Sequence, residues 1–285
     1  VMLMLAFCVL VPLGDSIAKL LGGAVALCVL IFVRFSIQAV ILLPLVLLKG
    51  QSLRLPKGIL MWTLARTVLH ILGIGLMFTA LRYLPLADAL AIAFVMPFIM
   101  LLLGYFVMGE QVGIHRMAAC AVGFIGTLLV IQPNFAEVGF PALYPLGVAV
   151  VFSLFMMVTR RIARAMDPVK LQAISGIQAT SILIVLLFVF PDAIGDFSFS
   201  LPLTTWGLLA ALGLLGTFAH LFMTWSLRFA PASTVAPMQY LEIPFGTAIG
   251  WLIFSDLPNG MAAVGICITV GAGLYIIIRE QRLSK

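Results

Sequence analysis

The sequence predicts an all-α polytopic membrane protein whose ten transmembrane helices form two five-helix repeats of inverted topology. Three observations lead to this fold class. First, the 285 residues are 64% hydrophobic and 9% charged, with a mean hydropathy of +1.24, whereas ordinary soluble domains carry roughly 25% charged residues. Second, the apolar residues are gathered in long runs, two of which share a motif. Third, positive charge is concentrated in every second loop.

The apolar runs are long enough for a helix to cross a hydrocarbon core roughly 30 Å thick. Prolines, glycines and charged residues separate one run from the next. The predicted spans are about 1–20, 27–48, 58–81, 86–108, 115–133, 142–163, 168–190, 203–227, 232–254 and 260–279.

Two of the runs read as copies of each other. Each begins with a Leu-Arg-aromatic-x-Pro turn, at 81–85 and at 227–231, and each has a proline near its middle, Pro97 and Pro244. Paired, proline-interrupted segments in two halves of a membrane protein are a sequence pointer to a transporter's binding site. The duplication divides the single membrane domain into an N-terminal repeat, 1–137, and a C-terminal repeat, 138–285.

The loop charges indicate that the two repeats enter the membrane from opposite sides. Loop 49–58 contains three basic residues, whereas its counterpart 191–202 contains two acidic residues and no basic one. Conversely, loop 160–170 contains four basic residues and its counterpart 19–26 only Lys19. Positive residues mark the cytoplasmic side. With both termini cytoplasmic, twelve of the sixteen basic residues lie on that side and two outside.

The chain resembles the EamA group of the drug/metabolite transporter superfamily, which includes the YddG-type amino-acid exporters. The resemblance rests on the ten spans in two halves, on Arg82-Tyr83-Leu84-Pro85 and Arg228-Phe229-Ala230-Pro231, and on the mid-span prolines. It implies a metabolite exporter of the bacterial inner membrane, with a central cavity between the halves, acting as a monomer or homodimer.

Other classes of protein fit the sequence less well. The loops are too short for a nucleic-acid recognition module, so no nucleic-acid partner is expected. The expected partners are the lipid bilayer and a small-molecule substrate. No cofactor motif and no phosphate-binding loop is visible. The four cysteines fit neither a disulfide framework nor a metal site. A membrane-embedded enzyme or a channel remains the remote alternative, but neither convergent catalytic residues nor a polar pore ring is apparent.

Glu242 is the first candidate for substrate or proton contact, because charged residues within a span are costly and usually functional. Gln239 and Tyr240 precede it. Pro237 and Pro244 lack an N–H and free carbonyls one turn earlier. The alternative is that Glu242 pairs with an arginine and holds the halves together.

Arg66 and His70 are four residues apart on the third span and therefore share a helix face. Arg66 can bind a substrate carboxylate bidentately, and His70 can titrate or donate a hydrogen bond. The alternatives are an arginine that reaches the inner surface and a histidine satisfied by a neighbouring carbonyl.

Three further charged residues lie in the first two spans. Asp15 and Lys19 have the four-residue spacing of an ion pair. Arg34 is a candidate partner for Asp15 or for Glu242.

A polar stripe on the eighth span is formed by Thr217, His220 and Thr224, which either lines the cavity or bonds to a neighbouring helix. Met96, beside Pro97, is expected to form an adaptable wall. Asp88 is expected to be an exposed charge at a helix start.

Together with these residues, the resemblance implies a secondary transporter that exports amino acids, including aromatic or hydrophobic ones, or similar small metabolites by alternating access. The substrate would bind through its carboxylate to Arg66 and through its amine to Glu242. Export of other metabolites or of cationic drugs is the alternative, the latter favoured by Glu242 with aromatic walls. Uniport and proton-coupled exchange are both open.

Overall fold

The computed structural model describes residues 2–55, 58–107, 109, 113–194, 201–230 and 235–283. Over these residues the regular structure is entirely helical. The α-helices are Met2–Leu21 (α1), Leu27–Leu48 (α2), Ile59–Ala80 (α3), Leu86–Ala93 (α4), Met96–Phe106 (α5), Ile114–Val138 (α6), Tyr144–Ala163 (α7), Pro168–Val189 (α8), Leu203–Phe229 (α9), Glu242–Phe254 (α11) and Gly260–Leu283 (α12). Short 3-10 helices cover Phe140–Leu143 (η1), Pro191–Ile194 (η2) and Ala236–Leu241 (η3).

The predicted spans agree with these helices to within a few residues, apart from α6, which runs on to Val138. Among the described residues, seven helical segments are long and apolar enough to cross a membrane, with α4 and α5 counted together. Shorter apolar stretches lie within α6 and α12, at 114–129 and 260–275. Pro231 and the start of the predicted ninth span lie outside the described residues.

The two spans that share the motif are both broken, whereas α1 and α2 continue through Pro12 and Pro44. The fourth span is interrupted at Phe94 and Val95, so that α5 begins just before Pro97. In the ninth span the 3-10 helix η3, with Pro237 in its first turn, changes into α11 at Glu242, two residues before Pro244. A proline removes the N–H that would bond the carbonyl four residues earlier. At each break a backbone carbonyl near the middle of the protein therefore loses its helical N–H donor.

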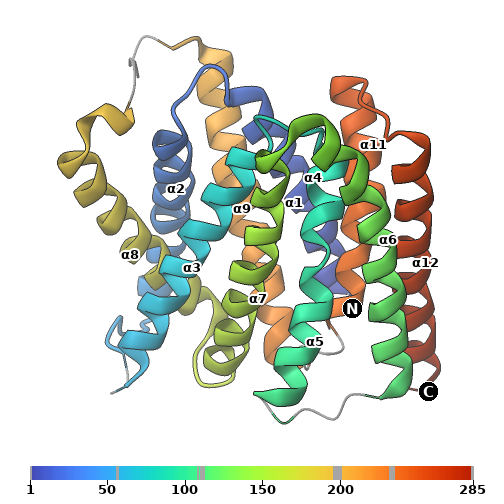
Figure 1. Ribbon diagram of the computed structural model, residues 1–285. Coiled ribbons are helices and arrows are strands. Elements are labelled where there is room, and N and C mark those ends of the chain that lie inside the picture. The colour runs from blue at the N-terminus through green and yellow to red at the C-terminus, as the bar shows by residue number, and fades with distance from the viewer. Residues whose placement is uncertain are drawn as a thin grey trace.

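Helices from the two halves of the sequence alternate in space. In Figure 1, α2, α3 and α8 form one side of the molecule and α6 with α12 the other, with α1, α4, α7, α9 and α11 between them. The most extensive interhelical packing joins α6 to α12, α1 to α9, α2 to α8 and α3 to α7. Each of these pairs takes one helix from each half.

The broken helices pack directly on each other, α4 against α11. Gly246 makes this approach possible, because a Cβ there would collide with the side chain of Leu90. The small-residue spacing Gly246-x3-Gly250 thus lies at a helix–helix contact, as such spacings do in membrane proteins.

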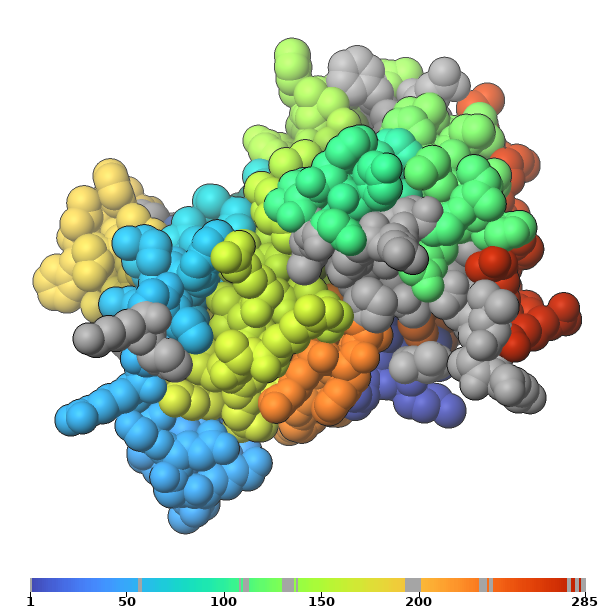
Figure 2. Space-filling view, turned by 90° about the horizontal axis from the view of Figure 1, so that it is seen from below, coloured from blue at the N-terminus to red at the C-terminus, as the bar shows by residue number. Residues whose placement is uncertain are grey.

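Both termini lie at the same end of the molecule, together with the connections from α2 to α3 and from α7 to α8 (Figure 1). Seen from this end, the last residues of α7 and α9 lie side by side at the centre of the face (Figure 2). Arg160 of α7 donates hydrogen bonds from Nη1 to the carbonyls of Leu227 and Arg228 at the end of α9. This contact ties α7 and α9 together at the basic end of the bundle.

The outer surface is apolar along the helices. Large hydrophobic side chains such as Val40, Phe188 and Leu252 are exposed. A soluble monomer exposes such side chains only in limited patches. This surface suits a lipid environment.

Candidate functional site

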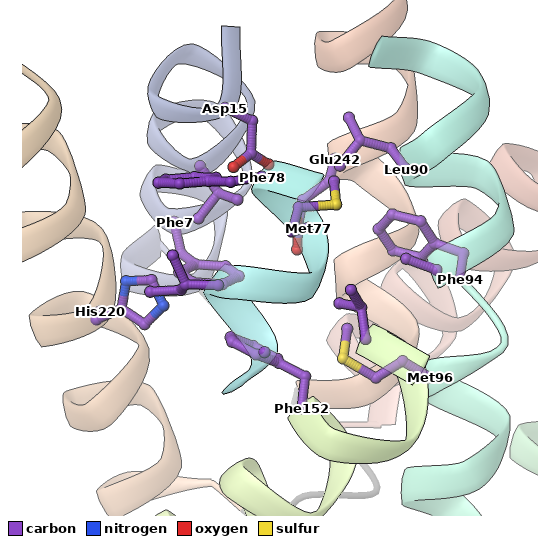
Figure 3. A pocket seen from close by; sticks show the side chains of 15 residues that line it. Phe7, Asp15, Met77, Phe78, Leu90, Phe94, Met96, Phe152, His220 and Glu242 are labelled. Carbon is purple, nitrogen blue, oxygen red and sulfur yellow. The ribbon is translucent and has the colours of Figure 1, made fainter. Parts of the chain in front are cut away.

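A central cavity of about 70 Å³ lies where the broken helices meet α1, α3, α7 and α9. Because one water molecule needs roughly 10–15 Å³, this cavity has room for several. The cavity wall is mainly apolar and includes four phenylalanines and two methionines, Phe7, Met77, Phe78, Phe94, Met96 and Phe152 (Figure 3). Three ionisable side chains also line it, Asp15, His220 and Glu242. An apolar pocket with a few convergent polar groups is the usual form of a small-molecule site.

Glu242 occupies this wall because of the helix break. It is the first residue of α11, where the helix dipole favours an acidic side chain. The side chain is 4% exposed, and Oε1 has no hydrogen-bond partner within the described residues. Within the described residues Glu242 also forms no ion pair with an arginine. A buried polar atom without a partner is costly, and Glu242 carries such an atom at the wall of the cavity.

Asp15 reaches the cavity from one face of α1. Phe7, Val11 and Asp15 follow one another at four-residue spacing, and all three line the cavity. Lys19, one turn further on, instead forms an ion pair with Asp256, with 2.9 Å between Nζ and Oδ2. The Asp15–Lys19 pair expected from the spacing is therefore not formed, because Lys19 extends to the loop after α11.

A second, smaller cavity of about 40 Å³ adjoins the first and shares Asp15, Phe78 and His220 with it. Arg34 of α2 lines this second space, which we call the Arg34 cavity. Asp15 and Arg34 thus face one small volume without forming an ion pair.

The guanidinium of Arg34 is held on one side only. Nη2 lies 2.9 Å from Nδ1 of His220 and 3.5 Å from the carbonyl of Gly216, and the group lies over the ring of Phe35 at 4.7 Å. Within the described residues Nη1 has no partner. Gly216 makes room for this arrangement, since a Cβ there would lie 2.6 Å from Nε of Arg34.

The two histidines of the spans are in contact. The rings of His70 and His220 lie 4.3 Å apart, and His70 also stacks on Phe155 at 4.4 Å. Neither nitrogen of His70 has a hydrogen-bond partner among the described residues. His70 lines neither of the two cavities. Its ring contacts that of His220, which lines both.

Arg66 does not lie where a substrate carboxylate can reach it from the central cavity. It is fully buried and donates to hydroxyl groups of Thr159 at 2.9 Å, Ser175 at 2.6 Å and Thr224 at 3.5 Å. Its guanidinium lies over Phe155, 4.7 Å from the ring centroid. Neither Arg66 nor His70 lines the central cavity, and the pairing of Arg66 with Glu242 around an amino acid is not supported by this geometry.

Three other predicted site residues point away from both cavities. Gln239 donates to Sδ of Met156 at 3.3 Å. Tyr240 packs on Phe94 and towards α6, where a Cβ on Gly123 would lie 2.6 Å from its hydroxyl oxygen. Thr224 donates to the carbonyl of His220 and receives the bond from Arg66.

Two further expectations have different outcomes. Met96 does line the central cavity, from the first residue of α5. Asp88, by contrast, is buried rather than exposed, because α4 packs inside the bundle.

The sequence did not single out three of the cavity phenylalanines, Phe7, Phe78 and Phe152. They are three among 21 phenylalanines, and aromatic residues in a span usually face lipid or other helices. The one usable signal was their register. Phe7 lies on the same face of α1 as the intramembrane Asp15, and that face had a reason to point inward.

Comparison with known proteins identifies the family. The sequence model of the EamA-like transporter family matches residues 1–132 and again residues 139–279. The chain belongs to this family. The family is described as one of transporters.

Similar proteins support a small-metabolite transporter. A riboflavin transporter of Rhizobium johnstonii is 29% identical over 78% of this chain and 72% of its own length. An S-adenosylmethionine uptake transporter of Rickettsia prowazekii is 24% identical over 95% of this chain and 89% of its own. One crystal structure, 20% identical, aligns with a TM-score of 0.72 over 99% of this chain and 96% of that chain, which bears on the fold alone. These relatives do not carry the amino-acid substrate expected from the resemblance to YddG-type exporters.

Proposed function

We propose that this EamA-family transporter is a secondary transporter of a small metabolite with a planar aromatic part, bound in the central cavity and released by alternating access. The observation that carries the proposal is the cavity wall. Four phenylalanines, Phe7, Phe78, Phe94 and Phe152, surround a space that also contains the carboxyl groups of Asp15 and Glu242. Aromatic faces bind planar rings or cations, and the carboxyl groups accept hydrogen bonds.

The mechanism needs two halves that can rock against each other. We assign them to residues 1–137 and 138–285. The family model matches once in each half, which supports a duplication. The packing supports a two-fold relation between the halves: if α1 corresponds to α7 and α3 to α9, the α1–α9 contact is the counterpart of the α3–α7 contact.

The orientation follows from charge. Both termini lie at the end of the bundle that also carries the basic connection between α7 and α8. Because positive loops face the cytoplasm, this end is cytoplasmic in our proposal, and the membrane is the bacterial inner membrane. At this end Arg160 joins α7 to the last residues of α9.

An aromatic amino acid is the second candidate substrate. Its ring would suit the phenylalanine wall, its ammonium group Glu242, and its carboxylate the free side of Arg34. In this version Arg34 replaces Arg66 as the carboxylate ligand, because Arg34 lines a cavity and Arg66 does not.

The test is counterflow into proteoliposomes with radiolabelled riboflavin, S-adenosylmethionine and aromatic amino acids, with and without a pH gradient. We expect uptake of at least one planar aromatic compound. Glu242→Gln should lower its rate about tenfold or more, as expected for the loss of a hydrogen bond to a charged group. A rate that is independent of the pH gradient would exclude proton-coupled exchange.

The matched control is Asp256→Asn, which removes an acidic group from the surface ion pair with Lys19 and leaves the cavity unchanged. Its rate should equal that of the wild type. Folded protein that transports none of these compounds, or a Glu242→Gln variant as fast as Asp256→Asn, would contradict the proposed function.

A further inference from the structure

The Arg34 cavity contains three polar groups that have unused hydrogen-bonding capacity and no ion pair. Arg34, His220 and Asp15 are 3%, 5% and 8% exposed. Within the described residues, Nη1 of Arg34 and Nε2 of His220 have no partner, and the carboxyl group of Asp15 joins no ion pair. All three line one space of about 40 Å³. Buried polar groups are nearly always satisfied, so this cluster is built for a ligand.

The contact with Arg34 determines what His220 offers. Nδ1 of His220 lies 2.9 Å from Nη2 of Arg34 and 3.0 Å from the carbonyl of Gly216. A guanidinium has only donors, and the Gly216 carbonyl already has Nη2 of Arg34 as a donor, so we assign the tautomer in which Nδ1 accepts from Arg34. In a neutral imidazole the proton is then on Nε2, the nitrogen without a partner. The Arg34 cavity therefore presents two donors, Arg34 Nη1–H and His220 Nε2–H, and one acceptor, the Asp15 carboxylate.

The surroundings fix the shape of the ligand. The Arg34 cavity and the central cavity share Asp15, Phe78 and His220. In Figure 3 the ring of Phe78 lies directly beneath the carboxyl group of Asp15, and Phe7 lies beside His220. A ligand that reaches Arg34 with one edge would thus have its body between phenylalanine rings, where a planar ring system packs best.

We propose that the Arg34 cavity recognises the imide edge of a planar heterocycle, in which an N–H stands between two carbonyl groups. The carbonyls accept from Arg34 and His220, and the N–H donates to Asp15. This inference rests on the proposed function and narrows its substrate class to flavin-like or pyrimidinedione-like compounds. Glu242, on the wall of the central cavity, binds the hydroxyl or other donor groups on the remainder of the molecule.

An amino-acid zwitterion would use the same residues differently. Its carboxylate would bind Arg34 and its ammonium group Asp15. The two ligands are distinguished by the imide N–H itself: methylating it leaves the rings, the carbonyls and the overall charge in place but removes the donor to Asp15. The decisive comparison therefore needs no protein variant.

The experiment measures binding to purified wild-type protein in lipid nanodiscs, by quenching of ligand fluorescence. The ligands are riboflavin, lumichrome, which keeps the imide edge but lacks the sugar-alcohol chain, and 3-methylriboflavin, in which the edge is blocked. Phenylalanine and tyrosine compete as zwitterionic probes. We expect riboflavin and lumichrome to bind within about tenfold of each other and 3-methylriboflavin to bind about 10- to 100-fold more weakly, the range for a hydrogen bond to a charged group.

The variant arm uses Asp15→Asn. Its discrimination between riboflavin and 3-methylriboflavin should fall to less than about threefold, whereas Asp256→Asn should keep the full ratio. Equal binding of riboflavin and 3-methylriboflavin by the wild type would overturn the inference. Binding of phenylalanine or tyrosine without binding of any imide compound would also overturn it. If a different metabolite is transported in a Glu242-dependent way while no imide compound binds, the imide proposal fails and the proposed function stands.

Discussion

Two buried arginines on neighbouring helices have opposite surroundings. Arg66 of α3 is bonded by three hydroxyl groups and stacked on Phe155. Arg34 of α2 is held by His220 and Gly216 on one side and has Nη1 free towards a cavity. Neither forms an ion pair in the described part of the chain. The difference teaches that an intramembrane charge is a binding group only where its own helices leave some of its donors unused.

The largest effect on transport is expected from Arg34. Arg34→Gln keeps a donor for His220 but removes the free guanidinium nitrogen. We expect kcat/KM in counterflow to fall about 10- to 100-fold, because a hydrogen bond to a charged group is worth roughly 1.5–3 kcal/mol. The thermal unfolding midpoint should stay within about 2 °C of the wild type. A normal rate with this variant would place the binding groups elsewhere in the central cavity.

The reverse pattern is expected at Arg66. Arg66→Met removes three hydrogen bonds, which in membrane proteins are worth about 0.6 kcal/mol each. The midpoint should therefore drop by about 5 °C, whereas transport per folded molecule should remain within about twofold. Loss of transport at unchanged stability would instead make Arg66 the carboxylate ligand that its spacing with His70 predicted.

Gly216 offers an intermediate way to disturb Arg34. In Gly216→Ala the new Cβ would lie 2.6 Å from Nε of Arg34, well inside the contact distance of about 3.5–4.0 Å, so the guanidinium must move. We expect a rise in KM of about tenfold, within the range that small misplacements cost. Gly207→Ala is the control on the same helix, since a Cβ there meets nothing within 4 Å. Equal KM values for the two variants would show that the position of Arg34 does not matter.

The smallest effect is expected at the surface. Lys19 and Asp256 are partly exposed, with side-chain exposures of 20% and 34%. Such pairs contribute roughly 0–1 kcal/mol. Asp256→Asn should leave both KM and the unfolding midpoint nearly unchanged. A large loss of transport here would mean that the loop after α11 takes part in the transport cycle.

The helices and their breaks were predictable from sequence because each depends on a local property. A run of apolar residues sets the length of a span, and the paired mid-span prolines Pro97 and Pro244 marked the two spans that are broken. Glu242, Met96 and Asp15 were also marked in advance, by charge within a span or by closeness to a break. All three line the central cavity.

The separate roles of Arg34 and Arg66 were not predictable, because they depend on which helices surround each side chain. The same holds for Gln239 and Tyr240, which are neighbours of Glu242 in sequence but point to α7 and α6. Sequence adjacency within a 3-10 turn does not place side chains on one face. Phe7, Phe78 and Phe152 were missed for the same reason, since the direction of their side chains is set by helix rotation.

The space that Gly216 leaves for Arg34 also has an evolutionary consequence. A methyl group at 216 and a guanidinium at 34 compete for one volume, so a larger residue at 216 requires that the side chain at 34 move or be shorter. Among related transporters, a larger residue at the position of Gly216 should therefore occur together with a shorter side chain at the position of Arg34. Such a paired exchange would mark the branches of the family that have lost this polar contact and changed their cargo.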